Sequence, residues 1–174
     1  MIIESIKFEY QRYKKLAEGT FAQVPDEALT RVFGDDNNSI SILVGHISGN
    51  LKSRFTDFLT SDGEKPWRNR DKEFEDQGFS RAEMLKAWEE GWQVLFNTLD
   101  SLHDDQLGDR VSIRGVELTV IEALHRSLTH ISYHVGQIVF IGKMVAGAAW
   151  KSLSIPRGGS AAYNQNPTKE KKPW

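Results

Sequence analysis

The sequence contains no cysteine. This absence excludes disulfide bonds, thiolate metal ligands and a cysteine nucleophile. A metal site in this chain must therefore use histidine, carboxylate, amide or water ligands.

The sequence also lacks an excess of basic residues and any long apolar run. The net charge is −2 over 174 residues, so no global positive field attracts nucleic acid or anionic lipid. No apolar stretch of about 18 residues and no signal-like N-terminus is present. With 39% hydrophobic and 26% charged residues, the composition is that of a globular protein. We expect a cytoplasmic protein whose residues 1–174 form one domain, without nucleic acid or membrane as partners.

Apolar residues recur at helical spacing in four segments. These segments are residues 2–21, 40–59, 80–102 and 119–145. Two of them begin with a capping box, in which Ser80 precedes Glu83 by three residues and Thr119 precedes Glu122 by three. The pattern predicts four amphipathic helices, whose apolar stripes would form a common core.

The connections between these helices differ in length. Residues 60–79 are polar and form a long loop, which is either an anchored surface loop or a lid over a site, with Trp67 and Phe74 as candidate anchors. Residues 110–118 alternate around Arg114-Gly115 and predict a hairpin. We therefore predict an all-α fold: a four-helix bundle with a long crossover loop, a small hairpin before the last helix and an irregular C-terminal tail at residues 150–174.

Two histidines in the last helix, His130 and His134, are four residues apart and therefore one turn apart on the same side. His46 lies at the flank of the apolar stripe of the second helix, as the pair does in the last helix. Histidines at stripe edges on two helices can meet where the core opens to solvent. We predict a metal site of three histidines, which leaves coordination positions for water or substrate.

Other metal schemes fit less well. A metalloprotease helix requires glutamate directly after the first histidine, and residue 131 is Ile. A di-iron bundle requires Glu-x-x-His on two helices, and the single match, Glu122 to His125, lies at a helix start where Glu122 serves the capping box.

In each histidine, the ring nitrogen that does not bind the metal carries an N–H group. Side chains on the same helical faces are candidates to accept a hydrogen bond from it. They are Asn50, Ser53 and Asp57 beside His46, and Ser127 and Gln137 beside the other two. Arg126 is one turn before His130 and either meets an anionic substrate or remains a solvated surface charge. Tyr133 either donates a hydrogen bond to a substrate or has a packing role. The loop at residues 157–160 is an anion site or a plain turn.

These residues together resemble a known family. A histidine in GHISGN (residues 45–50), followed by HISYHVGQ (residues 130–137), resembles the DinB-like superfamily of damage-inducible, YfiT-type proteins over nearly the whole chain. The stretches DGEKPW (residues 62–67) and SIPRG (residues 154–158) are similar to an uncharacterised bacterial branch of it.

The resemblance implies a four-helix bundle that holds a divalent metal, nickel or zinc, through His46, His130 and His134. It also implies a metal-dependent enzyme of the thiol S-transferase type, which joins a low-molecular-weight thiol such as bacillithiol or mycothiol to a small electrophile. Two alternatives remain open: a non-catalytic, stress-associated dimeric bundle that binds metal or a small ligand, and a metal-dependent hydrolase with Asp57 as the base. We expect a homodimer.

Overall fold

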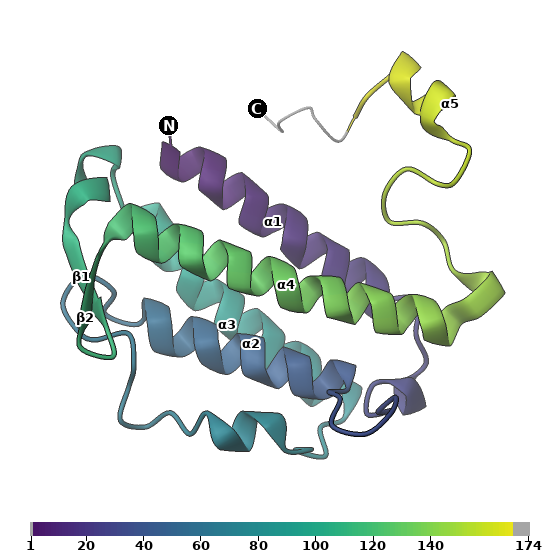
Figure 1. Ribbon diagram of the computed structural model, residues 1–174, viewed down its shortest axis with the longest axis horizontal. Helices are drawn as coiled ribbons and strands as arrows, with labels where there is room; N and C mark the ends of the chain where they lie inside the picture. The colour runs from purple at the N-terminus through teal and green to yellow at the C-terminus, as the bar shows by residue number, and fades with distance from the viewer. Residues whose placement is uncertain (1, 169–174) are drawn as a thin grey trace.

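Four long helices dominate the computed structural model, which describes residues 2–168 (Figure 1). They are α1 (Ile2–Phe21), α2 (Ile40–Phe55), α3 (Arg81–Ser101) and α4 (Val120–Ala146). Both capping boxes form as predicted, because the Ser80 and Thr119 side chains each accept the backbone N–H of the glutamate three residues later. Short-range sequence signals thus determine where α3 and α4 begin.

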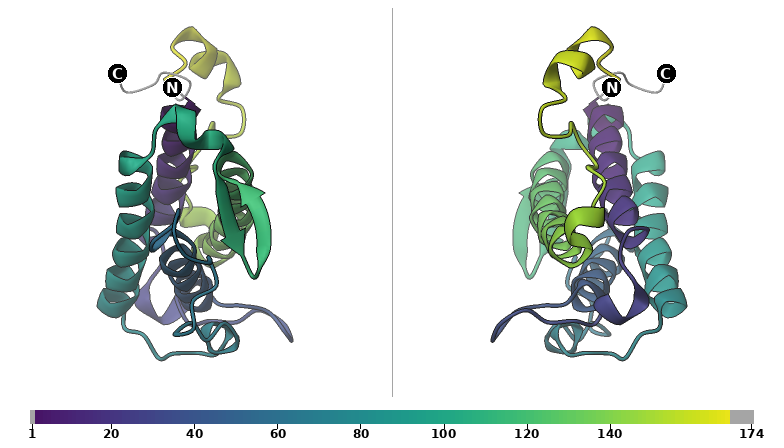
Figure 2. Two further views of the ribbon diagram at one scale, coloured as in Figure 1. Left: turned by 90° about the vertical axis from the view of Figure 1, so that its left-hand side faces the viewer. Right: turned by 90° about the vertical axis from the view of Figure 1, so that its right-hand side faces the viewer.

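The helices pack as two close pairs, α2 on α3 and α1 on α4, and α2 also contacts α4 (Figures 1 and 2). The apolar stripes meet in a core that contains the fully buried rings of Tyr10, Trp88 and Trp92. The Tyr10 hydroxyl donates a hydrogen bond to the Leu124 carbonyl oxygen at 3.0 Å, which satisfies its polar atom inside the core.

The predicted hairpin is confirmed. Strands β1 (Arg110–Ile113) and β2 (Val116–Thr119) pair antiparallel, with Ile113 opposite Val116. Arg114 and Gly115 both have positive φ, 57° and 72°, as a two-residue turn of type I′ requires. The hairpin covers one end of the bundle directly before α4 (Figure 2).

The second helix ends four residues earlier than we predicted, at Phe55 rather than residue 59. Thr56 is extended and Asp57 has a φ of 49°, so the chain turns away from the helix axis. Phe58 is still buried, because the turn returns its ring to 5.3 Å from that of Phe55. The apolar pattern therefore continued past the true helix end.

The crossover loop, residues 56–79, contains the short helix η2 (Asp71–Phe74) and runs alongside α2 (Figure 1). The prediction that Trp67 anchors this loop to the bundle is wrong, since Trp67 is 58% exposed. Phe74 does contact the bundle, with its ring centroid 4.5 Å from that of His46.

Shorter helical turns complete the chain. They are η1 (Asp26–Ala28), η3 (Asp104–Gly108), η4 (Gly147–Ala149) and the short helix α5 (Ser160–Gln165). Because α5 is helical, the predicted irregular tail is correct only for the segments around it; residues 169–174 lie outside the described part. Within residues 2–168, no helix combines the length and apolarity needed to cross a membrane.

Candidate metal centre

Three histidines from two helices converge at the contact between α2 and α4. His46 Nε2 lies 3.1 Å from His130 Nε2, and His134 Nε2 lies 3.2 Å from the same atom. His46 and His134 are buried, and His130 is half-buried. One nitrogen from each ring thus faces a common point, as the sequence predicted.

The other ring nitrogens point outward, and two of them have acceptors. His46 Nδ1 lies 2.9 Å from a Glu73 carboxylate oxygen, and His134 Nδ1 lies 2.8 Å from the Gln137 amide oxygen. Because both partners are acceptors, Nδ1 carries the proton in each ring and Nε2 presents its lone pair. His130 Nδ1 is buried without a hydrogen-bond partner within residues 2–168.

This donor set fits a divalent cation. Metal–imidazole bonds of about 2.0–2.1 Å at tetrahedral or octahedral angles place ligand nitrogens roughly 2.9–3.4 Å apart. The two Nε2 separations of 3.1 and 3.2 Å that involve His130 lie in that range, and the ligand nitrogens of all three rings lie within 4.8 Å of one another. A single proton on His130 Nε2 could satisfy only one of the two lone pairs that face it, whereas one cation satisfies all three nitrogens.

The surroundings of His130 and His134 favour the neutral form of both rings. Burial, together with the charges of His134, His46 and Arg68, lowers the pKa of His130 to about 3. Burial also lowers the pKa of His134, against the opposing hydrogen bond to Gln137. Neutral rings near pH 7 are what metal coordination requires.

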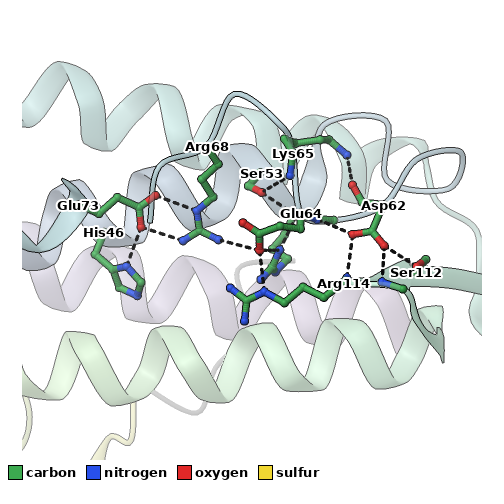
Figure 3. Close-up of polar contacts among 12 residues, drawn as sticks. His46, Ser53, Asp62, Glu64, Lys65, Arg68, Glu73, Ser112 and Arg114 are labelled. Carbon is green, nitrogen blue, oxygen red and sulfur yellow. Dashed lines mark hydrogen bonds and ion pairs between the residues drawn. The ribbon is translucent and has the colours of Figure 1, made fainter. Parts of the chain in front are cut away.

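The crossover loop supplies the residue that orients His46. Glu73 accepts two hydrogen bonds from Arg68, each 2.8 Å long, besides the one from His46 (Figure 3). Burial raises the pKa of the Glu73 carboxyl, but the hydrogen bonds from Arg68 and His46 outweigh it and hold the pKa below its ordinary value. Gly49 of α2 makes room for this arrangement, because a Cβ there would overlap the Glu73 carboxylate.

Sequence reasoning missed both Glu73 and Arg68. Glu73 is 27 residues from His46 along the chain and lies in a loop, where no helical spacing predicts which way a side chain points. The unusual length of the loop was the only signal that it might cover something.

A pocket of about 440 Å³ opens beside the histidines, between α2, α4, the hairpin turn and the crossover loop. His46 and His130 form part of its wall, and Phe55, Phe58 and Ile113 supply apolar surface. Its polar surface is dominated by five arginines: Arg54, Arg68, Arg70, Arg114 and Arg126. Among the described residues that line it, none is acidic. The pocket is therefore basic and gives a small molecule access to the histidines.

Most of the predicted neighbours lie at this site. Asn50, Arg126 and Tyr133 line the pocket, with Tyr133 64% exposed, and Gln137 contacts His134. Asp57 does not lie there. It follows the end of α2, its side chain is exposed, and the helical position that we projected for it was wrong.

Ser53 also faces elsewhere, since its hydroxyl donates to the Gly63 carbonyl oxygen at 2.6 Å. Ser127 lines the pocket wall without contacting a histidine nitrogen. The ring nitrogens of His46 and His134 are therefore oriented by Glu73 and Gln137, of which only Gln137 was predicted.

Comparison of the sequence with known proteins assigns the chain to a family. No curated protein and no solved structure matches the chain. A family model described as "Protein of unknown function (DUF1572)" matches residues 1–159, which cover nearly all of the chain, including the three histidines and every residue of the pocket. The chain therefore belongs to the DUF1572 family.

Proposed function

We propose that this protein is a DinB-like enzyme that depends on a divalent metal, nickel or zinc, and transfers a small thiol to a small electrophile. The observation that carries the proposal is the convergence of three imidazole nitrogens beside an open pocket. Imidazole suits both metals. The sequence resemblance to the DinB-like superfamily supports the thiol, and the absence of cysteine is compatible with a sulfur that arrives on a cosubstrate.

A divalent ion bound by the three histidines would supply Lewis acidity, which lowers the pKa of a thiol. Glu73 and Gln137 fix the ring orientation of His46 and His134. The Asn50 amide on the pocket wall can hydrogen-bond a substrate. A sulfur–carbon bond forms, and a leaving group departs with its electron pair. The thiol proton passes to solvent, since none of the residues between 2 and 168 that line the pocket is a carboxylate that could accept it.

The alternatives receive less support. A hydrolase needs a side chain that activates water, and Asp57, the carboxylate considered for that role, lies outside the pocket. A non-catalytic metal site would leave no access for a substrate, whereas the pocket wall includes His46 and His130. The homodimer stays a prediction, since its pairing face is not defined by any residue discussed above.

Metal analysis of the purified protein tests the foundation of this proposal. We expect about one ion per chain in wild type after expression in metal-replete medium, and a large loss in His46→Ala, His130→Ala and His134→Ala. His125→Ala is the matched control, because His125 lies exposed on α4 outside the site. Equally little metal in wild type and in all variants would show that the site is not a metal centre.

An activity screen then tests the reaction class. Bacillithiol and monochlorobimane are suitable reactants, and we expect turnover that a chelator abolishes and that added nickel or zinc restores. Wild-type protein with a full complement of metal that turns over no thiol with any electrophile would contradict the transferase assignment and leave the metal site intact.

A further inference from the structure

The pocket beside the histidines carries more positive charge than its own acidic neighbours balance. Two carboxylates, Glu64 and Glu73, serve the guanidinium groups of this region. Glu64 Oε2 is shared by three arginines: it lies 2.8 Å from Arg114 and 3.9 Å from Arg68 (Figure 3). It also lies 3.2 Å from Arg54. One oxygen cannot satisfy three guanidinium groups at short range.

Arg68 shows the deficit most directly. Its side chain is 1% exposed, and its Nη1 atom is buried without a hydrogen-bond acceptor within residues 2–168. A buried guanidinium N–H that lacks an acceptor costs free energy, and an acceptor in the pocket would remove that cost. Burial and the nearby positive charge of Arg68 also lower the pKa of Arg54, which reflects the same crowding of cations.

Arg126 lies on the α4 wall of the same pocket, one turn before His130. Its guanidinium is exposed and makes no hydrogen bond or ion pair with any residue between 2 and 168. Arg70 is likewise without a carboxylate in that part of the chain and stacks on Phe74 at 4.9 Å. The pocket thus has guanidinium groups from two elements, α4 and the crossover loop.

We infer that this pocket binds a small organic molecule through a carboxylate or phosphate group, which Arg126 holds together with Arg54 and Arg68. The guanidinium fork pairs with both groups through two parallel hydrogen bonds. The apolar wall of Phe55, Phe58 and Ile113 would accommodate the rest of the molecule. The idea that this anion is a substrate rests on the proposed function. The idea that the pocket binds an anion depends only on the arrangement of the arginines.

Calorimetric titration with two probes, inorganic phosphate and succinate, tests the inference. The full-length chain is used as purified and after chelation, so that coordination of the anion by a metal is separated from binding by arginine. We expect saturable binding of at least one probe in both states, and the stronger probe identifies the group. Arg126→Ala should weaken that binding about tenfold or more, and Arg126→Lys, which keeps the charge but loses the fork, should weaken it less.

Arg157→Ala is the matched control, because Arg157 is exposed, lies in the C-terminal segment and carries the same charge. No saturable binding by chelated wild type, or equal losses in Arg126→Ala and Arg157→Ala, would overturn the inference.

His130→Ala separates this proposal from the metal centre. We expect this variant to lose metal and to keep anion binding. Metal binding without anion binding in wild type would refute the anion site alone, and anion binding without metal would refute the metal centre alone.

Discussion

A single carboxylate, that of Glu73, joins the three-histidine cluster to the crossover loop. It accepts the His46 N–H and two Arg68 N–H groups, so the ring orientation of His46 on α2 depends on a residue of the crossover loop. Partners of this kind raise the basicity of a ligating imidazole and fix its tautomer. Glu73 is therefore the residue outside the three histidines on which metal affinity should depend most.

Replacing Glu73 tests this role. We expect Glu73→Ala to lower metal affinity about tenfold or more, and Glu73→Gln, which keeps an oxygen acceptor, to lower it less. Competition with a chromogenic chelator measures the affinity. Glu75→Ala is the control, because Glu75 is exposed in the same loop. Equal affinities in all three variants would show that Glu73 does not support the metal.

The contrast between Gln137 and Glu73 shows how far sequence reasoning reaches at this scale. Gln137 is three residues after His134 on one helix, so its contact follows from helical geometry. Glu73 is in η2, a short helical turn within the crossover loop and far from His46 in sequence, and Asp57 was projected onto a helix that had already ended. Spacing rules locate partners only while the backbone remains regular.

At the scale of elements, Gly91 marks a close approach of α3 to α2. A Cβ on Gly91 would lie 2.8 Å from the Ser48 Cα, so the glycine allows the two backbones to approach. We expect Gly91→Ala to destabilise the fold by about 1–3 kcal/mol, because backbone has to move. Gly136→Ala on α4 is the matched control, since a Cβ there meets no described atom within 4 Å.

The control should be neutral or stabilising by up to about 1 kcal/mol, as expected for alanine in a helix interior. Urea unfolding compares the two variants, and a Gly91→Ala midpoint at or above that of wild type would contradict the close approach.

Asp62 attaches the crossover loop to the hairpin. Its carboxylate accepts hydrogen bonds from the Ser112 hydroxyl and from the backbone N–H groups of Gly115, Glu64 and Arg114, and these hold its pKa well below the ordinary value. Because the folded pKa is lowered, the stabilisation is complete above the unfolded pKa of about 3.9 and is lost as the pH falls through the folded pKa.

We therefore expect Asp62→Asn to lower stability at pH 7 by about 1 kcal/mol, a modest value because the site is close to solvent. The variant should also lose less stability than wild type on acidification below about pH 4. Denaturant unfolding at pH 7 and pH 3 measures both effects. Asp35→Asn is the control, as Asp35 is exposed; the same acid sensitivity in Asp62→Asn and wild type would rule out this attachment.

Most of the architecture could be predicted from local signals, and the exceptions share a physical cause. The starts of α3 and α4 and the hairpin turn depend on capping and turn residues a few positions apart. The end of α2, the exposure of Trp67 and the short helix α5 depend on which distant surfaces are available for packing. A single sequence contains no direct record of those surfaces.

For the whole molecule, a metal that binds only the folded state should stabilise it. At free metal about 100 times the dissociation constant the gain is about 2.7 kcal/mol, which for a domain of this size corresponds to roughly 5–10 °C in Tm. We expect nickel or zinc to raise the Tm of wild type and of His125→Ala, and a chelator to reverse the rise. His46→Ala should show no rise in Tm. A wild-type Tm that does not change when nickel or zinc is added would contradict a metal site that exists only in the folded state.

The pairing of the helices also predicts the order in which they come together during folding. α2 and α3 are neighbours along the chain, whereas Tyr10 of α1 and Leu124 of α4 meet across 114 residues. Closing the shorter connection costs less entropy, so His46 should be in place before α4 returns with His130 and His134. An ion that needs all three rings then contributes little to the transition state for folding. Such an ion would slow unfolding instead, and would therefore lengthen the lifetime of the native chain.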